Sequence, residues 1–391
     1  MANDVDVLIL GGGCAGLSLA WRLAALGTHC PKVMILEKRS TYVNDRTWCF
    51  WDNNDTRLAG LLTHQWRWLK LRSRSKTVRF DCGSNAYQML AASSFYDCAL
   101  QATRACPAIT LVLEQAVDGE LTQGPDGWTA ATARGDITAR AVVDTRPTVS
   151  VAAGGATLWQ SFYGHEVCCD TDVFTPEAAQ LMDFTAGAQG QIPFTYVLPI
   201  TARRALIEAT VFGPEPLGPA LLAAKLDAAV QQHTAGSTFE VVRRESGILP
   251  MGLTHRPPSL GPGHVAVGVM AGGARASSGF AFQRIQQWAQ QCGAAIADGR
   301  HPTPHRADPP LVRLMDQLFL RVLRDAPHAA PDLFLSLFER ADPASLVRFL
   351  SGSSTVQDCL RVVNALPARV FVRQLFHGST AWRWHPTGGQ P

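Results

Sequence analysis

Continuous apolar runs separated by small residues mark the beginning of the chain. Residues 7–10 (Val-Leu-Ile-Leu) contain no polar position, which is typical of a strand buried on both faces. A segment rich in alanine and leucine follows and predicts a helix, and a second apolar run at 33–36 ends on Glu37. The order strand, helix, strand predicts a βαβ unit within residues 1–50.

The turn between the first strand and the helix has the spacing Gly11-x-Gly13-x-x-Gly16. Gly11 permits a tight turn, Gly13 lets backbone amides approach a pyrophosphate, and Gly16 lets helix and strand pack closely. The helix N-terminus favours a diphosphate, and Glu37 can accept hydrogen bonds from ribose hydroxyls. These features favour a dinucleotide site over a purely structural glycine turn, without distinguishing FAD from NAD.

The middle of the chain changes to the alternating pattern of half-buried strands. Residues 66–81 alternate in character as antiparallel strands do, whereas 88–105 have a helical pattern. Several short strands are predicted within 109–143, with a turn at 124–127. The apolar run Ala141-Val142-Val143 is a further predicted strand and ends on Asp144.

The second half continues with sheet and then becomes helical. Strands are predicted over 157–212 and 238–250, with a helix at 217–233 between them. A glycine-rich turn at 268–279 opens a helix at 280–292, and the pattern is helical from about 308 to 377, before a frayed tail.

This order predicts an α/β fold: a Rossmann-like dinucleotide-binding domain, which the resemblance described below assigns to FAD, an inserted β-rich substrate domain and a helical C-terminal region. The expected segments are a nucleotide-binding βαβ segment at 1–65 and a mixed segment at 66–143, which partly returns to the nucleotide-binding domain at 136–147. A β-rich substrate domain at 148–250, a return to the nucleotide-binding domain at 251–300 and the helical region at 301–391 follow.

Composition excludes several classes of protein. The net charge of +3 over 391 residues, with no arginine-lysine block, argues against nucleic-acid binding. The ten cysteines contain no CxxC pair, and no His/Cys cluster has metal-site spacing, so no metal is expected. The early first strand leaves no room for a signal peptide, and no window approaches the roughly eighteen apolar residues of a membrane span, so we expect a cytoplasmic protein.

The motifs resemble those of the bacterial lycopene cyclases, within the flavoprotein superfamily of aromatic hydroxylases and geranylgeranyl reductases. Besides the opening fingerprint, the resemblance rests on residues 44–51 (NDRTWCFW), 142–147 (VVDTRP), 159–164 (WQSFYG) with 181–184 (LMDF), 196–199 (YVLP), 205–210 (ALIEAT), 245–251 (ESGILPM), and 347–352 (VRFLSG) with 365–367 (ALP). One segment departs from the family's Pro-x-Thr-Gly-Tyr pattern near the flavin, because it reads Ala276-Ser277-Ser278-Gly279-Phe280. The surviving glycine predicts that cofactor binding is retained.

The resemblance implies that the chain closes the linear ends of lycopene, or of a related linear carotenoid, into β-ionone rings. FAD would act in its reduced form, with NAD(P)H as the reductant and no net redox change. The fingerprint and the resemblance together assign these residues to the cofactor: Gly11, Gly13, Ala15, Gly16, Glu37, Arg46, Asp144, Gly272 and Gly279. The alternatives are a redox flavoprotein of the same superfamily, a monooxygenase or polyene reductase, and a non-catalytic flavin- or carotenoid-binding protein.

Such a cyclisation needs a carboxyl group that stays protonated near neutral pH in an apolar pocket. Glu208 interrupts the apolar segment 205–212, and the resemblance assigns it the role of proton donor. The alternatives for Glu208 are an exposed edge or an ion pair with Arg203 or Arg204. Glu245 is the second candidate acid, but its arginine neighbours favour a charged, structural role.

Aromatic and apolar residues bear on the substrate. Trp48, Phe50 and Trp51 suggest either ordinary core packing or an aromatic lining for a polyene. Apolar runs punctuated by arginine at 333–340 and 360–366 suggest either a packed domain face or contact with lipid. Because a long polyene is stored in membrane, we expect peripheral membrane association.

Overall fold

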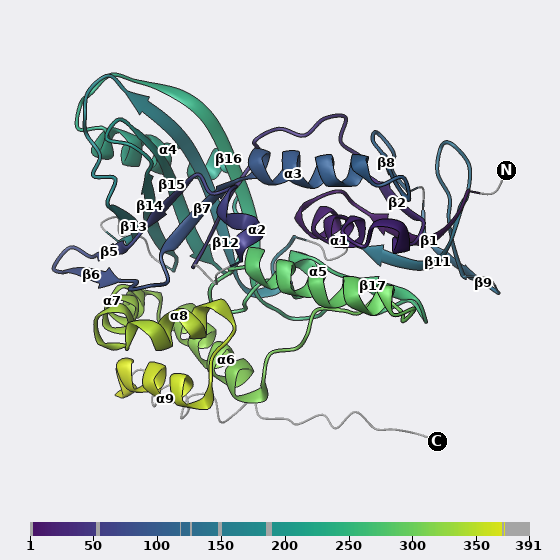
Figure 1. Ribbon diagram of the computed structural model, residues 1–391. Coiled ribbons are helices and arrows are strands. Elements are labelled where there is room, and N and C mark those ends of the chain that lie inside the picture. Colours follow the sequence, from purple (N-terminus) through teal and green to yellow (C-terminus); the bar gives the residue numbers. More distant parts are fainter. Residues whose placement is uncertain are drawn as a thin grey trace.

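The computed structural model describes residues 3–51, 55–117, 119–125, 127–147, 151–184, 190–369 and 371. Its first sheet is the nucleotide-binding type of parallel sheet that the N-terminal pattern predicts, extended by two antiparallel strands (Figure 1). In spatial order its strands are β8 (Ile109–Val112), β2 (Val33–Leu36), β1 (Asn3–Leu10), β11 (Ile137–Asp144), β10 (Gly127–Ala130) and β9 (Thr122–Gly124), and β17 (His264–Ala266) also pairs with β11.

Helices that are far apart in the sequence pack on this first sheet. Leu19, Ala20 and Leu23 of α1 (Cys14–Ala24) share one buried cluster with Trp288 and Ala289 of α5 (Phe282–Ala297). The outer side of α1 is covered by α3 (Ala92–Ala105). The two distant segments therefore share one buried cluster with β1, β2 and β11.

The second sheet is a curved, mainly antiparallel sheet at the upper left of Figure 1. Its order is β16 (Phe239–Leu253), β12 (Ala156–Cys169), β15 (Arg204–Gly213), β14 (Ile192–Pro199), β13 (Ala178–Asp183), β5 (Trp68–Arg72) and β6 (Thr77–Asp81). Only β13 and β5 pair in parallel among these strands. The hairpin β5–β6, from the predicted mixed segment, thus belongs to the same sheet as the predicted substrate domain.

Each face of the second sheet is covered by a different set of helices. Helix α4 (Pro219–His233) buries Leu226, Ala229 and Val230 on one face, against Ala205 and Ile207. The other face packs on the C-terminal helices α6 (Pro310–Asp325), α7 (Ala330–Arg340), α8 (Pro343–Ser351) and α9 (Val356–Ala365). Because successive side chains of a strand point to opposite faces, the even-numbered residues of β15 point toward the C-terminal helices.

A small third sheet links the two larger ones. It consists of β3 (Thr47–Trp51), β7 (Tyr87–Ala91) and β4 (His64–Trp66). The helix predicted over 88–105 begins only at Ala92, because residues 87–91 pair with two strands and are extended there. The remaining short elements are α2 (Thr56–Ala59) and the 3-10 turns η1 (Gly27–His29), η2 (Val269–Ala271) and η3 (Pro327–Ala329).

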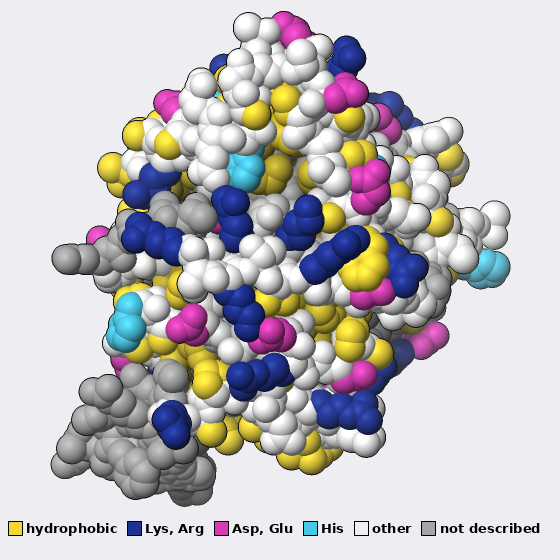
Figure 2. Space-filling view, turned by 90° about the vertical axis from the view of Figure 1, so that its left-hand side faces the viewer, with side chains coloured by type: hydrophobic (Ala, Val, Ile, Leu, Met, Phe, Trp, Pro, Cys, Tyr) yellow, Lys and Arg dark blue, Asp and Glu magenta, His cyan; other side chains and the backbone are white. Residues whose placement is uncertain are grey.

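The helical C-terminal region that the sequence predicts is described only in part. Four helices occupy 310–365, as the pattern indicates, whereas the frayed tail at 378–391 lies outside the described residues. Among the residues that are described, no helix has both the length and the apolar character needed to cross a membrane. The side of the molecule shown in Figure 2 mixes hydrophobic side chains with Lys and Arg.

Candidate functional site

One cavity runs from the glycine-rich turn after β1 to the inner face of the second sheet. Its volume is about 610 Å³, and both Gly13 and Glu208 line it. The C-terminal helices contribute apolar side chains such as Phe319 and Phe334 to the wall. The fold therefore brings the predicted dinucleotide turn and the predicted acid to a common cavity.

The geometry of the glycine turn matches a diphosphate site. A Cβ on Gly13 would meet no atom closer than Arg39 Nη2 at 4.0 Å, so its backbone faces open space. A Cβ on Gly16 would collide with the carbonyl oxygen of Gly11, which explains the close packing of α1 on β1. Because α1 has no side-chain cap at Gly13 and no acid in its first turn, its positive end is left for an anionic group.

The buried carboxylate of Glu37 helps to fix this turn. It accepts hydrogen bonds from the backbone N–H of Gly12 (2.7 Å) and of Arg39 (2.9 Å). Tyr42, which the sequence did not suggest, donates its hydroxyl to the carbonyl oxygen of Gly12 at 2.9 Å.

The predicted cofactor residues divide into two groups. The first group reaches the cavity wall and consists of Gly13, Ala15, Arg46 and Gly279. The second group supports the site without forming the wall and consists of Gly11, Gly16, Glu37, Asp144 and Gly272. Asp144 is turned toward Arg146, which it binds through two hydrogen bonds of 2.7 and 3.0 Å.

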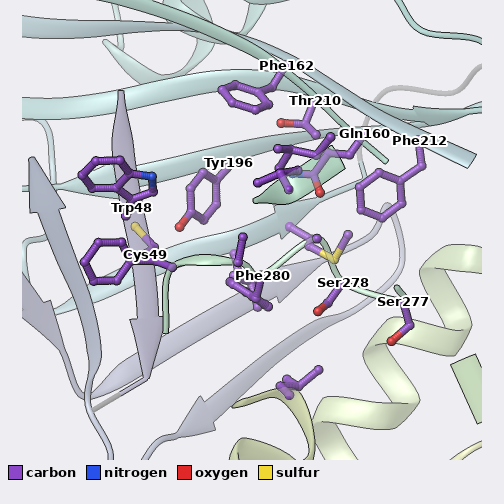
Figure 3. A pocket seen from close by; sticks show the side chains of 18 of the residues that line it. Trp48, Cys49, Gln160, Phe162, Tyr196, Thr210, Phe212, Ser277, Ser278 and Phe280 are labelled. Atoms are coloured by element: carbon purple, nitrogen blue, oxygen red, sulfur yellow. The ribbon is translucent and has the colours of Figure 1, made fainter. Parts of the chain in front are cut away.

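The segment that departs from the family pattern keeps its backbone shape. Gly279 has a φ of 74°, in the left-handed region that favours glycine. A Cβ there would lie 2.8 Å from Gln160 Oε1 on β12. Gln160 Oε1 and Ser278 Oγ are buried polar atoms of the described residues without a partner, and both side chains line the cavity (Figure 3). Unpaired polar groups in the part of the cavity beside Gly279 fit a polar ring system such as a flavin.

Two residues that the sequence did not single out hold this segment in place. His305 accepts a hydrogen bond from the backbone N–H of Gly268 at 2.9 Å, and burial lowers the pKa of His305 to about 3, so it remains a neutral acceptor. Arg275 is 1% exposed and pairs with Asp316 of α6 at 2.9 Å. Arg275 also donates to the carbonyl oxygen of Phe349 in α8 at 2.9 Å. A buried arginine has no recognisable pattern in a sequence, because only the fold supplies its partners.

Glu208 is one of the even-numbered residues between 206 and 212 of β15 that point into the cavity. Its neighbours Leu206, Thr210 and Phe212 line the same wall. The two arginines that were alternative partners of Glu208 pair elsewhere, because Arg203 binds Asp172 at 2.6 Å and Arg204 binds Glu166 at 2.6 Å. Burial, followed by the negative charge of Glu245, raises the pKa of Glu208 well above that of an ordinary carboxyl group.

Glu245 lies beside Glu208 on the cavity wall rather than on the surface. It forms an ion pair with Arg243 and accepts a hydrogen bond from the Thr47 hydroxyl at 2.8 Å. The sequence favoured a charged, structural acid at this position. The contact with Glu208 could not be seen in the sequence because it depends on strand register.

Aromatic side chains line the same cavity as the carboxyl pair. Trp48, Phe162 and Tyr196 lie around this end of the cavity, and Phe280 lies between them and Ser278 (Figure 3). Tyr196 contacts the hydroxyl of Tyr87 at 2.9 Å. Of the three clustered aromatics near the N-terminus, Trp48 and Trp51 line the cavity, whereas Phe50 is buried and stacks on Phe282.

A family model and a curated relative indicate the same family. The family described as lycopene cyclase protein matches residues 6–375. A lycopene beta-cyclase from a Paracoccus species is 32% identical over 251 residues, which cover 59% of this chain and 62% of the relative's own length.

Solved structures share the fold at low sequence identity. A geranylgeranyl bacteriochlorophyll reductase-like protein from Thermoplasma acidophilum has a TM-score of 0.62 at 14% identity, covering 96% of this chain and 100% of that one. A flavoprotein/dehydrogenase from Cytophaga hutchinsonii has a TM-score of 0.61 at 15% identity, covering 96% and 100%. The p-nitrophenol 4-monooxygenase of Pseudomonas putida has a TM-score of 0.59 at 13% identity, covering 97% and 98%. The predicted fold class is therefore confirmed: a Rossmann-like flavoprotein fold with a β-rich second sheet and a helical C-terminal region.

Proposed function

Because this chain belongs to the lycopene cyclase protein family, we propose that it closes the linear ends of lycopene, or of a related linear carotenoid, into β-ionone rings. The reaction is an isomerisation without net redox change. The observation that carries this proposal is the single cavity that joins the dinucleotide turn to a buried acid. A redox flavoprotein needs only the dinucleotide turn, whereas an acid-catalysed cyclisation needs both the turn and the buried acid.

Glu208 is the proposed proton donor. Burial and the negative charge of Glu245 raise the pKa of Glu208, which favours the protonated carboxyl group that the reaction needs. The O–H proton of Glu208 adds to the terminal double bond of the polyene and leaves a tertiary carbocation. The neighbouring double bond then attacks this cation, and a proton leaves the ring carbon to form the ring double bond.

The walls of the cavity suit the cationic intermediate. The faces of Trp48, Phe162 and Phe212 offer negative quadrupole charge, and the apolar C-terminal helices exclude water that would trap the cation. FAD, held by the glycine turn and the segment around Gly279, supplies when reduced an electron-rich ring system that stabilises positive charge. NAD(P)H is the proposed reductant that keeps the cofactor in this form.

We also place the protein in the cytoplasm, in peripheral contact with membrane lipid. All the cysteines of the chain are free thiols, which fits a reducing compartment. Leu311 and Leu314 of α6 are exposed, as are Leu360 and Val363 of α9, and Val363 also lines the cavity. Exposed apolar side chains beside the cavity give a long apolar substrate a route from the bilayer.

The proposed function is tested by expressing the full chain in a host that accumulates lycopene. We expect cyclic carotenoids whose mass equals that of lycopene. A product heavier by oxygen or hydrogen would instead identify a monooxygenase or reductase, and unchanged lycopene beside a flavin-loaded protein would identify a binding protein.

The acid is tested by the isosteric variant Glu208→Gln, which keeps the size of the side chain but removes the transferable proton. General acid catalysis is worth about 10²–10⁴-fold, and we expect a loss at the upper end because an alkene is a poor base. Glu208→Asp should keep part of the activity, since it retains an acid on a shorter stem. Cyclisation by Glu208→Gln within about threefold of wild type would contradict the assignment.

A further inference from the structure

Three neighbouring strands place two carboxyl groups over a position without a side chain. Glu208 of β15 pairs with Gly164 of β12, and Gly164 pairs in turn with Glu245 of β16. Residues directly opposite one another in a sheet point to the same face, so both glutamates extend over Gly164 toward the cavity. A Cβ on Gly164 would lie 2.7 Å from Glu208 Cγ, so glycine is what leaves room for the two side chains to meet.

The two carboxyl groups have opposite electrostatic surroundings. Glu245 is anchored as an anion by the guanidinium of Arg243 and by the Thr47 hydroxyl, which itself accepts a hydrogen bond from Arg243 Nη2 at 2.8 Å. Arg243 is held from its other side by Glu166 at 2.9 Å. Glu208 has no ion-pair partner within the described part of the chain.

We propose that Glu208 and Glu245 share one proton across the gap above Gly164. In this pair, Glu245 is the positioning residue that keeps the proton on Glu208. The inference rests on the proposed cyclase function for its role in catalysis, but the shared proton itself is a property of the protein alone.

Two carboxyl groups in contact cannot both ionise without strong repulsion, so one proton stays on the pair. Arg243 and Thr47 stabilise negative charge on Glu245 and thereby direct the proton to Glu208. The titratable and charged groups around Glu208 come from five strands, and they are Glu245, Arg243, Glu166, Tyr196, Cys49 and Tyr87. Burial raises the pKa of Tyr87, Tyr196 and Cys49, so these three groups remain neutral and leave Glu245 as the anion that acts on Glu208.

The pair also closes the catalytic cycle. When the Glu208 O–H bond breaks and a C–H bond forms on the polyene, two carboxylates remain side by side. Their repulsion makes the pair a stronger base, so it takes the proton that the ring cation releases. The electron pair of the broken C–H bond becomes the ring double bond, the new O–H bond restores the acid, and no oxidant or reductant is consumed.

The proposal is tested by titrating the protonated carboxyl group with infrared spectroscopy on the full-length protein, without substrate. Wild type should show a protonated carboxyl band that persists at neutral pH and is absent from Glu208→Gln. In Glu245→Gln the anionic neighbour is lost, so the band should titrate at lower pH. Arg244→Gln is the matched control, because Arg244 is an exposed neighbour on β16, and its titration should equal that of wild type.

The same shift should appear in the pH profile of lycopene cyclisation. The alkaline limb for Glu245→Gln should move to lower pH, with about a tenfold loss per pH unit above its midpoint, whereas Glu208→Gln should keep a low rate that does not change across this limb. An unshifted band and an unshifted alkaline limb in Glu245→Gln would overturn the proposal. If Glu245→Gln does not fold, Glu245→Asp serves instead: a lowered midpoint supports the shared proton, and a wild-type midpoint overturns it. Wild-type protein that shows the band but does not cyclise lycopene would reject the proposed function and leave the carboxyl pair intact.

Discussion

The glycine beneath the two carboxyl groups gives a quantitative test of the site. In Gly164→Ala, the new methyl carbon would lie 2.7 Å from Glu208 Cγ, whereas ordinary carbon contacts are about 3.5–4.0 Å. Glu208 must therefore move by about 1 Å, away from Glu245 and from its position in the cavity. A displacement of this size at a reacting group costs about 10²-fold in rate, or about 2.7 kcal/mol of transition-state stabilisation.

The fold should tolerate the same change. Overpacking costs about 1–3 kcal/mol, and replacing glycine by alanine returns about 0.4–1 kcal/mol through the unfolded chain. We expect flavin content to stay near wild type, a modest decrease in melting temperature, and a cyclisation rate about 10²-fold lower under saturating lycopene.

The matched control is Gly213→Ala on β15, whose new methyl carbon would meet no atom closer than 3.7 Å. This variant should cyclise lycopene as wild type does. A folded Gly164→Ala protein with a rate equal to that of Gly213→Ala would refute the argument that room above Gly164 positions the acid.

Two further predictions concern the cofactor and the membrane. Gly13→Leu should abolish flavin retention in a folded protein, because the backbone at Gly13 faces the open cavity. The control Gly218→Ala should retain flavin, because its new methyl group meets nothing within 4 Å. Equal flavin absorbance in both purified variants would contradict the cofactor assignment. Wild-type protein should sediment with phospholipid vesicles and be released by mild detergent. Leu360→Glu on α9 should weaken this binding more than Leu221→Glu, which changes a still more exposed leucine on α4. Equal binding by the two variants would place the lipid contact elsewhere.

Local patterns were sufficient for some parts of this structure and not for others. The unbroken apolar runs and the glycine spacing predicted β1, α1 and β2, because close backbone packing restricts those positions to small or apolar residues. The acid within 205–212 became a candidate because a lone carboxyl group in an apolar strand is rare, and the resemblance to lycopene cyclases assigned it the role of proton donor, which stays a prediction. Neither inference requires knowledge of distant contacts.

The remaining features depend on partners that are far apart in the sequence. The contact between Glu208 and Glu245 requires the register of three strands, and the function of Gly164 is invisible until that register is known. Residues 87–91 form a strand instead of the predicted helix because β3 and β4 supply its hydrogen bonds. Tertiary pairing outweighs local propensity in such segments.

The buried guanidinium of Arg275 has a consequence for the whole molecule. It belongs to the segment that ends at Gly279 on the cavity wall, yet its partners are Asp316 of α6 and Phe349 of α8. Removing the guanidinium would therefore leave the Asp316 carboxylate buried without its cationic partner, at a junction between the cavity wall and two helices. One buried side chain thus ties the segment at Gly279 to α6 and α8, whose Phe319 and Phe349 line the same cavity.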